Sequence, residues 1–200
     1  MFFIEFFQKY LMRLIVFFLI FFSLNKLTMA EEKRAYFAGG CFWCVEEAFE
    51  KTPGVLKAIS GYTGGDLKNP TYEQVTYNET GHYEAVEVVY DPKVVSYNQL
   101  LDVFWKNIDP YDAQGQFCDK GSSYLTAVFY QNDEEKLAFE DSKRKLGKSD
   151  ISSFVTHLKK LDVFYPAENY HQDYYKNNPI RYKLYKTGCG RAQRLKKIWD

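Results

Sequence analysis

The sequence predicts a single domain of the α/β (α+β) class, with a mixed sheet and helices packed against it. Segments with the alternating polarity of strands are interleaved with segments whose apolar residues recur at helical spacing. Clusters rich in Gly, Pro and Asn separate these segments and mark the turns between them. The 200 residues are enough for one hydrophobic core and too few for two comfortable ones.

The first thirty residues have the pattern of a secretory signal peptide. Two cations, Lys9 and Arg13, precede an apolar run over 14–22, and the small-residue signature Thr28-Met29-Ala30 follows it. The run is shorter than the ~20 residues that a membrane-spanning helix needs. We therefore predict a cleaved leader over 1–30 and a mature domain over 31–200.

This interpretation makes the protein periplasmic or secreted. An uncleaved membrane anchor is one alternative, because apolar residues at 2–7 lengthen the leader upstream. A translation start at Met29 is another, and it would make the protein cytoplasmic.

Four elements are expected in the first part of the domain. Residues 34–38 form an apolar strand that ends at the glycine pair 39–40. Residues 41–51 carry apolar side chains at helical spacing and stop at a Thr-Pro-Gly turn. A second strand spans 55–61, and a loop rich in Gly, Asn and Pro follows over 64–70.

The second part continues the alternation. Residues 84–90 alternate like a strand, and Ser96 starts a helix that ends before an Asp-Pro pair. A further strand is expected over 125–130, followed by a charged helix over 132–146 that Asn132 caps. From residue 164 onward the chain is rich in Tyr and poor in periodicity, so we expect irregular coil with short helices there.

The charge balance and the cysteine content exclude several classes. Lys plus Arg equals Asp plus Glu, 26 against 26, so neither nucleic acid nor an acidic surface is expected as the main partner. Four cysteines are too few for a disulfide scaffold. Cys41 and Cys44 are three residues apart and Cys118 and Cys189 are isolated, a distribution that suits redox chemistry better than stapling.

Cys41 is the candidate nucleophile. The two glycines before it allow a sharp turn after the strand and deliver it to the start of a helix. Free N–H groups and the positive end of the helix dipole favour a thiolate there, which is the reactive form. Cys44, one turn later, could reach a sulfenic acid formed on Cys41. A zinc knuckle would need a second Cys pair, whereas a thioredoxin-like disulfide oxidoreductase remains an open alternative.

Glu84 is the candidate acid. It has the parity of Val86, Val88 and Tyr90 in its strand, and a carboxyl group on an apolar face has a raised pKa and can donate a proton. The alternative is a glutamate at a strand end that simply reaches solvent.

Seven short motifs together resemble methionine sulfoxide reductase A, the family of peptide-methionine (S)-S-oxide reductases. They cover the domain from Arg34 to Trp199. In order, they are Gly40-Cys41-Phe42-Trp43; Ser60-Gly61-Tyr62-Thr63-Gly64-Gly65; Asn69-Pro70-Thr71-Tyr72; Thr80-Gly81-His82 before Glu84; Phe104-Trp105 with Asp109-Pro110; Gln116-Phe117-Cys118-Asp119 with Gly121; and Tyr170-His171-Gln172.

The resemblance implies a two-layer sandwich with a ferredoxin-like core, and a role for each site residue. Cys41 would attack the sulfoxide sulfur while Glu84 protonates its oxygen. The implied supporting residues are the hydroxyls of Tyr72 and Tyr124, the carboxyl group of Asp119, and the apolar wall of Phe42 and Trp43 for the S-methyl group. A Ser-Tyr-Leu sequence at 123–125 departs from the common Gln-Tyr-Arg, and Tyr83 precedes Glu84 where a smaller or basic residue is usual.

The resemblance also implies how the enzyme is reset. Cys41 would become a sulfenic acid, a second thiol would close a disulfide, and an external thioredoxin-like protein or dithiol would reduce it. We favour Cys44 as the resolving thiol, with Cys189, flanked by two glycines in a flexible tail, as the alternative or as a relay. Cys118 is expected to be a packed, inert thiol. The implied substrates are oxidised proteins or free methionine sulfoxide, with no cofactor, no metal and a monomer by default.

Overall fold

The computed structural model describes residues 31–146 and 151–200. The predicted leader over 1–30 therefore lies outside the described residues. Residues Glu32–Asp200 form one compact unit. In the part of the chain that is described, no helix has the length and apolar character needed to cross a membrane.

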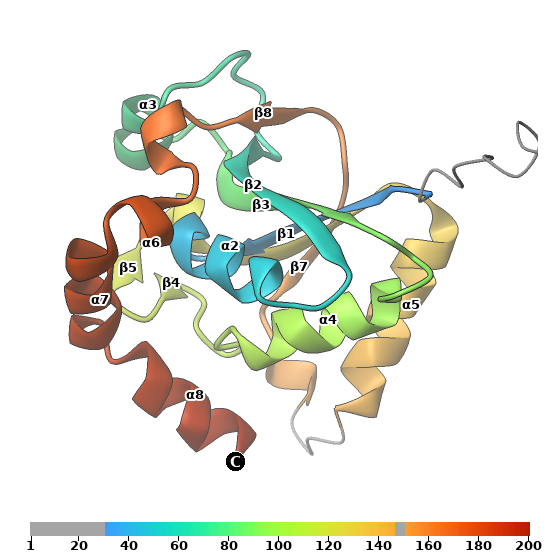
Figure 1. Ribbon diagram of the computed structural model, residues 1–200. Helices are drawn as coiled ribbons and strands as arrows, with labels where there is room; N and C mark the ends of the chain where they lie inside the picture. The colour runs from blue at the N-terminus through green and yellow to red at the C-terminus, as the bar shows by residue number, and fades with distance from the viewer. Residues whose placement is uncertain (1–30, 147–150) are drawn as a thin grey trace, which may run out of the picture. The chain divides into compact units, whose positions relative to one another are not determined.

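A six-stranded mixed sheet is the centre of the fold (Figure 1). The strand order is β7-β6-β1-β3-β2-β8, in which only β6 and β7 pair in parallel and the other neighbours are antiparallel. The bounds are β1 Lys33–Gly39, β2 Val55–Thr63, β3 Tyr83–Tyr90, β6 Thr126–Tyr130, β7 His157–Lys160 and β8 Phe164–Pro166. A separate pair joins β4 Gly115–Gln116 to β5 Asp119–Lys120. The mixed sheet expected from the sequence is confirmed.

The helices lie around this sheet, and several of them pack against its strands (Figure 1). Their bounds are α2 Phe42–Glu50, α3 Tyr72–Tyr77, α4 Tyr97–Lys106, α5 Asp133–Lys145, α6 Tyr174–Asn177, α7 Pro179–Gly188 and α8 Arg191–Trp199. Short 3-10 turns occupy η1 Ser122–Tyr124, η2 Ile151–Ser153 and η3 Asn169–His171. Strands and helices alternate along the chain, so the α/β class is confirmed.

Side-chain caps fix where several helices begin. The Ser96 hydroxyl accepts from the backbone N–H of Gln99, and the Asn132 side chain accepts from that of Glu135, as the sequence predicts. Thr71 forms a capping box with Gln74 and starts α3, a helix that was not predicted from the sequence. Its Thr-x-x-Gln spacing is a helix-start signal that could have been recognised.

The pleat of β1 divides the core between the two faces of the sheet. Phe37 joins the main apolar cluster, where it packs against Phe49 of α2 and Phe104 of α4. Tyr36 and Ala38 point the other way, into a smaller cluster. Alternate residues of a strand face opposite sides, so β1 is buried on both faces and central strands position the site rigidly.

The C-terminal segment is more helical than we expected. Instead of mostly irregular coil, it forms α7 and α8 after the short α6 (Figure 1). Pro179 occupies the first turn of α7, where its missing N–H costs nothing. The apolar residues Ile180 and Leu184 are exposed and Tyr182 is buried, so the periodicity of apolar residues misidentifies the buried face.

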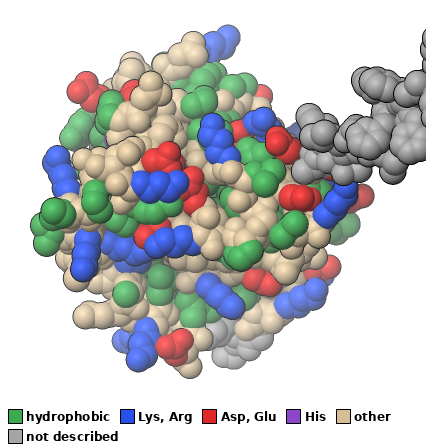
Figure 2. All heavy atoms as spheres, viewed as in Figure 1, with side chains coloured by type: hydrophobic (Ala, Val, Ile, Leu, Met, Phe, Trp, Pro, Cys, Tyr) green, Lys and Arg blue, Asp and Glu red, His purple; other side chains and the backbone are tan. Residues whose placement is uncertain are grey.

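The surface carries both signs of charge. In Figure 2, Lys and Arg side chains are interspersed with Asp and Glu over the face in view, consistent with equal numbers of cationic and acidic residues in the whole sequence.

Candidate active site

Cys41 lies at the turn between β1 and α2, as predicted. Gly40 before it has φ +78°, and a Cβ there would lie 2.4 Å from Cβ of Gln116, so the turn requires glycine at this position. The Cys41 carbonyl accepts from the backbone N–H of Cys44 at 3.1 Å, and Cys41 is the N-cap of α2. Both sulfur-bearing residues are buried and free.

A small cavity of about 80 Å³ brings most of the predicted site together. Its lining consists of Cys41, Phe42, Trp43, Tyr72, Glu84, Asp119, Tyr124 and Tyr185. Seven of these eight were singled out from the sequence, and they come from four separate parts of the chain. Cys44 lies one turn behind Cys41, and Cys189 does not line the cavity.

Glu84 is buried on β3, and it faces the start of α2. Its Oε2 accepts from the backbone N–H of Phe42 at 3.0 Å, and the Tyr124 hydroxyl also hydrogen bonds to it. Burial raises the pKa of Glu84 to about 8 despite these hydrogen bonds. The carboxyl group is therefore mostly protonated at neutral pH and can donate a proton beside the Cys41 sulfur.

Tyr72 and Tyr124 approach the cavity from different elements. Tyr72 is the first residue of α3, where its backbone N–H donates to Oε1 of Glu168 at 2.9 Å. Tyr124 ends the η1 turn, and the two hydroxyls hydrogen bond with each other. Burial raises the pKa of both tyrosines, so both are neutral hydroxyls that can hydrogen bond to a polar atom in the cavity.

Phe42 and Trp43 form the aromatic wall. Trp43 stacks on Tyr174, with ring centroids 3.7 Å apart and planes at 7°. Its Nε1–H donates to Nδ1 of His171 at 3.2 Å, and the Phe42 ring lies 4.9 Å from the same imidazole. Burial lowers the pKa of His171 to about 4, so this histidine is a neutral acceptor that orients the wall.

The protonation of the two buried thiols differs from what the helix start alone suggests. Burial raises the pKa of Cys41 well above its ordinary value, which opposes the thiolate that the helix start favours. The Cys41 thiol donates to Cys44, and this hydrogen bond lowers the pKa of Cys44, with Arg191 and Tyr182 acting in the same direction. Removal of water from the sulfur therefore acts against the helix dipole at Cys41.

Cys118 and Cys189 form a disulfide, with Cα atoms 5.0 Å apart. The expectation that Cys118 is a packed, inert thiol is wrong, because it is exposed and bonded. Cys189 is not in a loose tail either. It is the C-cap residue of α7, and Gly190 in the left-handed region begins the next helix. The disulfide joins the residue before Asp119 to the end of α7.

Two site residues, Tyr182 and Tyr185 of α7, were not identified from the sequence. Tyr182 donates to Oε2 of Glu47 at 2.5 Å and hydrogen bonds to Cys44. Tyr185 donates to Oδ2 of Asp119 at 2.5 Å and hydrogen bonds to Cys41. Their i, i+3 spacing places both on one face of a helix, a signal that appears only once the segment is recognised as helical.

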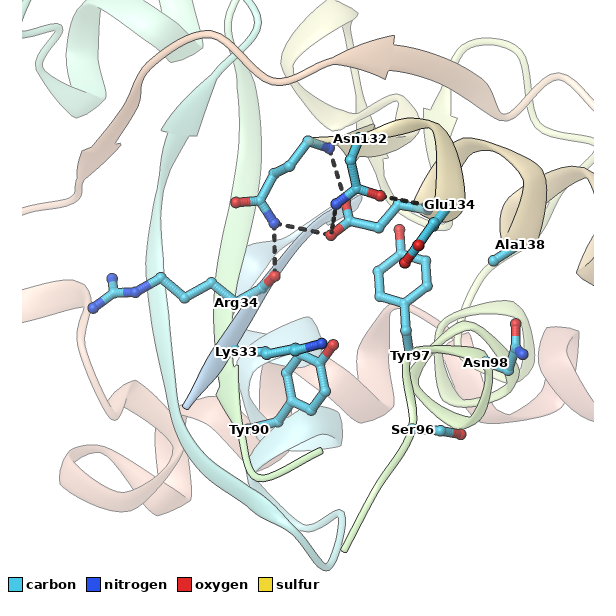
Figure 3. Close-up of a pocket in the computed structure, with 11 residues that line it drawn as sticks. Lys33, Arg34, Tyr90, Ser96, Tyr97, Asn98, Asn132, Glu134 and Ala138 are labelled. Atoms are coloured by element: carbon cyan, nitrogen blue, oxygen red, sulfur yellow. Dashed lines mark hydrogen bonds between the residues drawn. The ribbon is translucent and has the colours of Figure 1, made fainter. Parts of the chain in front are cut away.

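A larger cavity lies away from these residues, near the starts of α4 and α5 (Figure 3). It has a volume of about 470 Å³ and contains none of the predicted site residues. Gln131 bonds to the Arg34 carbonyl and to Glu135 on one side of it. No cysteine or histidine lines this cavity, so sulfur chemistry belongs to the smaller one.

Two groups of side chains among residues 31–146 and 151–200 have metal-ligand atoms within 4.8 Å of one another. One consists of Cys118, Asp119 and Cys189, whose two sulfurs are already bonded to each other. The other consists of Glu46, Glu50 and Asp173, where Lys176 forms ion pairs with the last two. Glu46 accepts from the Ser60 hydroxyl and the backbone N–H of Asp173, so each group already has partners within the protein.

Comparisons with known proteins agree on one family. The profile described as peptide methionine sulfoxide reductase matches residues 33–200. The peptide methionine sulfoxide reductase MsrA of Bacillus licheniformis is 51% identical over 174 residues, which are 86% of this chain and 96% of that protein. MsrA 2 of Staphylococcus aureus is 47% identical over 167 residues, 82% of this chain and 94% of that one.

Solved structures show the same fold. Methionine sulfoxide reductase A of Corynebacterium diphtheriae has a TM-score of 0.68 and 30% identity, covering 76% of this chain and 77% of its own. Reduced Mxr1 from Saccharomyces cerevisiae has a TM-score of 0.70 and 28% identity, covering 77% and 90%. Mxr1 is also similar in its complex with Trx2, at a TM-score of 0.51 and 22% identity over 74% and 88%.

Proposed function

We propose a catalytic cycle for the cavity around Cys41 from the premise that this chain belongs to the peptide methionine sulfoxide reductase family. The enzyme reduces methionine sulfoxide to methionine. The observation that carries the assignment of residues is that the Cys41 sulfur and a carboxyl group with a pKa of about 8 line one small cavity.

The chemical step needs a nucleophile and an acid. The Cys41 sulfur, once deprotonated, attacks the sulfoxide sulfur while Glu84 gives its proton to the sulfoxide oxygen. The S–O bond of the substrate breaks, and the hydroxyl passes to Cys41, which leaves a sulfenic acid and a thioether. Hydrogen bonds from the hydroxyls of Tyr72 and Tyr124 support the oxygen as its charge changes, and Asp119 lines the same cavity.

The aromatic wall accounts for recognition of the substrate. Phe42 and Trp43 offer an apolar surface for the S-methyl group, and the oxygen must then point toward Glu84 to gain a proton. A sulfoxide of the opposite configuration would exchange oxygen and methyl group. One epimer alone is therefore expected to react. The family resemblance assigns it as the S epimer, either as free methionine sulfoxide or exposed in an oxidised protein.

We assign Cys44 as the thiol that resolves the sulfenic acid. It accepts a hydrogen bond from Cys41 in the reduced state, so the two sulfurs need only a small approach to form a disulfide. Cys189 is bonded to Cys118 in this structure and must be released before it can act, which favours Cys44 for the first disulfide.

A thioredoxin-like dithiol resets the enzyme. The similar protein Mxr1 has been solved in complex with Trx2, which supports a partner of this kind for the present chain. Exchange through a mixed disulfide regenerates the thiols and needs no bound cofactor.

We also propose that the protein is exported, on the basis of the leader over 1–30. N-terminal sequencing of the protein purified from its native cells tests this. A first residue of Glu31 supports cleavage, Met1 indicates an anchor, and Met29 indicates an internal start.

The separated S and R epimers of N-acetylated methionine sulfoxide test the reaction, with dithiothreitol as reductant. Turnover of the S epimer alone is expected. Turnover of the R epimer instead would overturn the proposed assignment of the sulfoxide oxygen to Glu84 and of the S-methyl group to the aromatic wall. Loss of both, with the thiols intact, would leave only disulfide exchange as a role for Cys41 and Cys44.

A further inference from the structure

Helix α7 contacts both buried thiols through two tyrosines. Tyr182 hydrogen bonds to Cys44, and Tyr185 hydrogen bonds to Cys41. Cys41, Cys44 and Tyr182 belong to one buried cluster, and the partly buried Tyr185 packs against it. Tyr185 also lines the cavity together with Asp119, and its ring meets that of Trp43 edge-on at 5.8 Å.

We propose that Tyr185 is a further catalytic residue. Its hydroxyl donates its one hydrogen bond either to the Asp119 carboxylate or to the Cys41 sulfur, according to the protonation state of Cys41. The proposal rests on the role of Cys41 as nucleophile proposed above. It is carried by the Tyr185 hydroxyl, which lies 2.5 Å from Oδ2 of Asp119 and within hydrogen-bond reach of Cys41.

A phenol has only one proton to donate. While Cys41 is a thiol and Asp119 is ionised, the Tyr185 proton belongs to the carboxylate. When Cys41 loses its proton, the sulfur becomes the acceptor that most needs a donor, because it is buried. Tyr185 then stabilises the thiolate, which is the state that attacks the sulfoxide.

The disulfide holds this arrangement from both ends. Cys118 directly precedes Asp119, and the backbone N–H of Cys189 donates to the carbonyl of Tyr185 at 3.0 Å. The Cys118–Cys189 bond therefore ties the strand that carries Asp119 to the helix turn that carries Tyr185. A donor fixed in this way loses little entropy when it binds the sulfur.

Other titratable and charged groups surround Cys41 and Asp119 and also affect the pKa of both residues. They are Glu84 and Cys44 beside Cys41, and Lys120 and Arg191 beside Asp119. The test must therefore remove the Tyr185 hydroxyl without moving these charges, which Tyr185→Phe does while keeping the ring against Trp43.

The experiment measures the rate of Cys41 alkylation by iodoacetamide against pH in the full chain, with Cys44→Ser present so that only one free thiol reacts. No reductant is added, so that the Cys118–Cys189 disulfide stays closed. Tyr185→Phe removes a hydrogen bond to the Cys41 thiolate, so the pH midpoint of alkylation is expected to rise by about one unit. With Cys44 restored, kcat for the S epimer should fall by about tenfold, with a smaller change in KM.

Tyr175→Phe is the matched control. Tyr175 also donates to a carboxylate, Oε2 of Glu50 at 2.7 Å. It packs against the same cluster, but it is not among the hydrogen-bond partners described for either thiol. Its alkylation profile should overlay that of the parent. Thermal unfolding of both variants shows whether they fold alike.

Asp119→Asn supplies the second arm. Without a carboxylate to bind, Tyr185 is free to donate to Cys41, so the midpoint should move downward, and by less when Tyr185→Phe is also present. Equal shifts in the two backgrounds, or an unchanged midpoint in Tyr185→Phe, would overturn the proposal. Alkylation does not depend on turnover, so these results are distinct from failure of the proposed function, which an active Cys41→Ser variant would reveal.

Discussion

The molecule contains two pairs of cysteines that differ in almost every respect. Cys41 and Cys44 are three residues apart, buried and free, at the start of a helix. Cys118 and Cys189 are 71 residues apart and bonded to each other, and Cys118 is exposed. Cys41 of the inner pair lines the small cavity, whereas Cys118 of the outer pair is open to solvent.

The difference shows that sequence spacing alone does not identify a disulfide. The closely spaced pair is set by one helical turn and is available for chemistry. The distant pair joins the end of α7 to the residue before β5, and Tyr185 of α7 hydrogen bonds to Asp119 of β5. Reactivity follows from burial and neighbours, as thiol chemistry requires.

The largest expected effect separates the two pairs directly. Cys41→Ser should reduce single-turnover reduction of the S epimer by at least about a thousandfold, because no other nucleophile lines the cavity. Cys118→Ser should still complete a single turnover. Rapid-quench measurement of methionine formed per enzyme checks both, and comparable losses in the two variants would contradict the division of roles.

The next largest effect concerns the acid beside the inner pair. Glu84→Gln keeps the shape of the side chain and an oxygen that can accept from the backbone N–H of Phe42, but the amide has no acidic proton. The rate of the reductive step should therefore fall by a factor of about 10² to 10⁴. The raised pKa of Glu84 makes the protonated form the active one. Activity of the wild type should therefore fall as the pH rises through about 8. The pH profile of single-turnover rates checks this, and persistence of that limb in Glu84→Gln would assign it to another group.

A smaller effect is expected in the outer pair, and it concerns stability. The bond closes a loop of 71 residues, and the entropy model gives about 4 kcal/mol of unfolding free energy for a loop of that size. Cys118→Ser and Cys189→Ser should each lower the midpoint of urea unfolding. The double variant should match either single one, whereas additive losses would show that packing rather than the bond was removed.

The smallest effect is expected at Tyr182. Tyr182→Phe removes a hydrogen bond to Glu47 and a donor to Cys44, which should cost about 1 to 3 kcal/mol of unfolding free energy. Its loss should raise the pKa of Cys44, because the thiolate loses a partner. Formation of the Cys41–Cys44 disulfide after one turnover, followed by mass spectrometry, should be slower, with the first methionine formed at the wild-type rate.

Much of the fold could be predicted because local patterns determine it. The alternation of side chains along residues 84–90 predicted β3, and the caps at Ser96 and Asn132 predicted where two helices begin. The C-terminal helices were missed because Ile180 and Leu184 face outward while tyrosines face the interior. Prediction from hydrophobic periodicity assumes that aliphatic side chains face the interior.

The site was predictable in its membership and less so in its electrostatics. The motifs identified seven of the eight residues that line the cavity. The protonation of Cys41 was not predictable, because the helix start is visible in the sequence but the depth of burial is not. The partner of Cys118 was not predictable either, because pairing across 71 residues is a property of tertiary structure.

The outer disulfide also changes the covalent connectivity of the chain. It turns residues 118–189 into a closed ring and leaves the preceding part linear. The ring contains Asp119, Tyr124 and Tyr185, whereas Cys41 and Glu84 belong to the linear part. The cavity is therefore assembled at the junction between a cyclic and a linear segment. Opening the ring would enlarge the conformational freedom of only one side of the site in the unfolded chain.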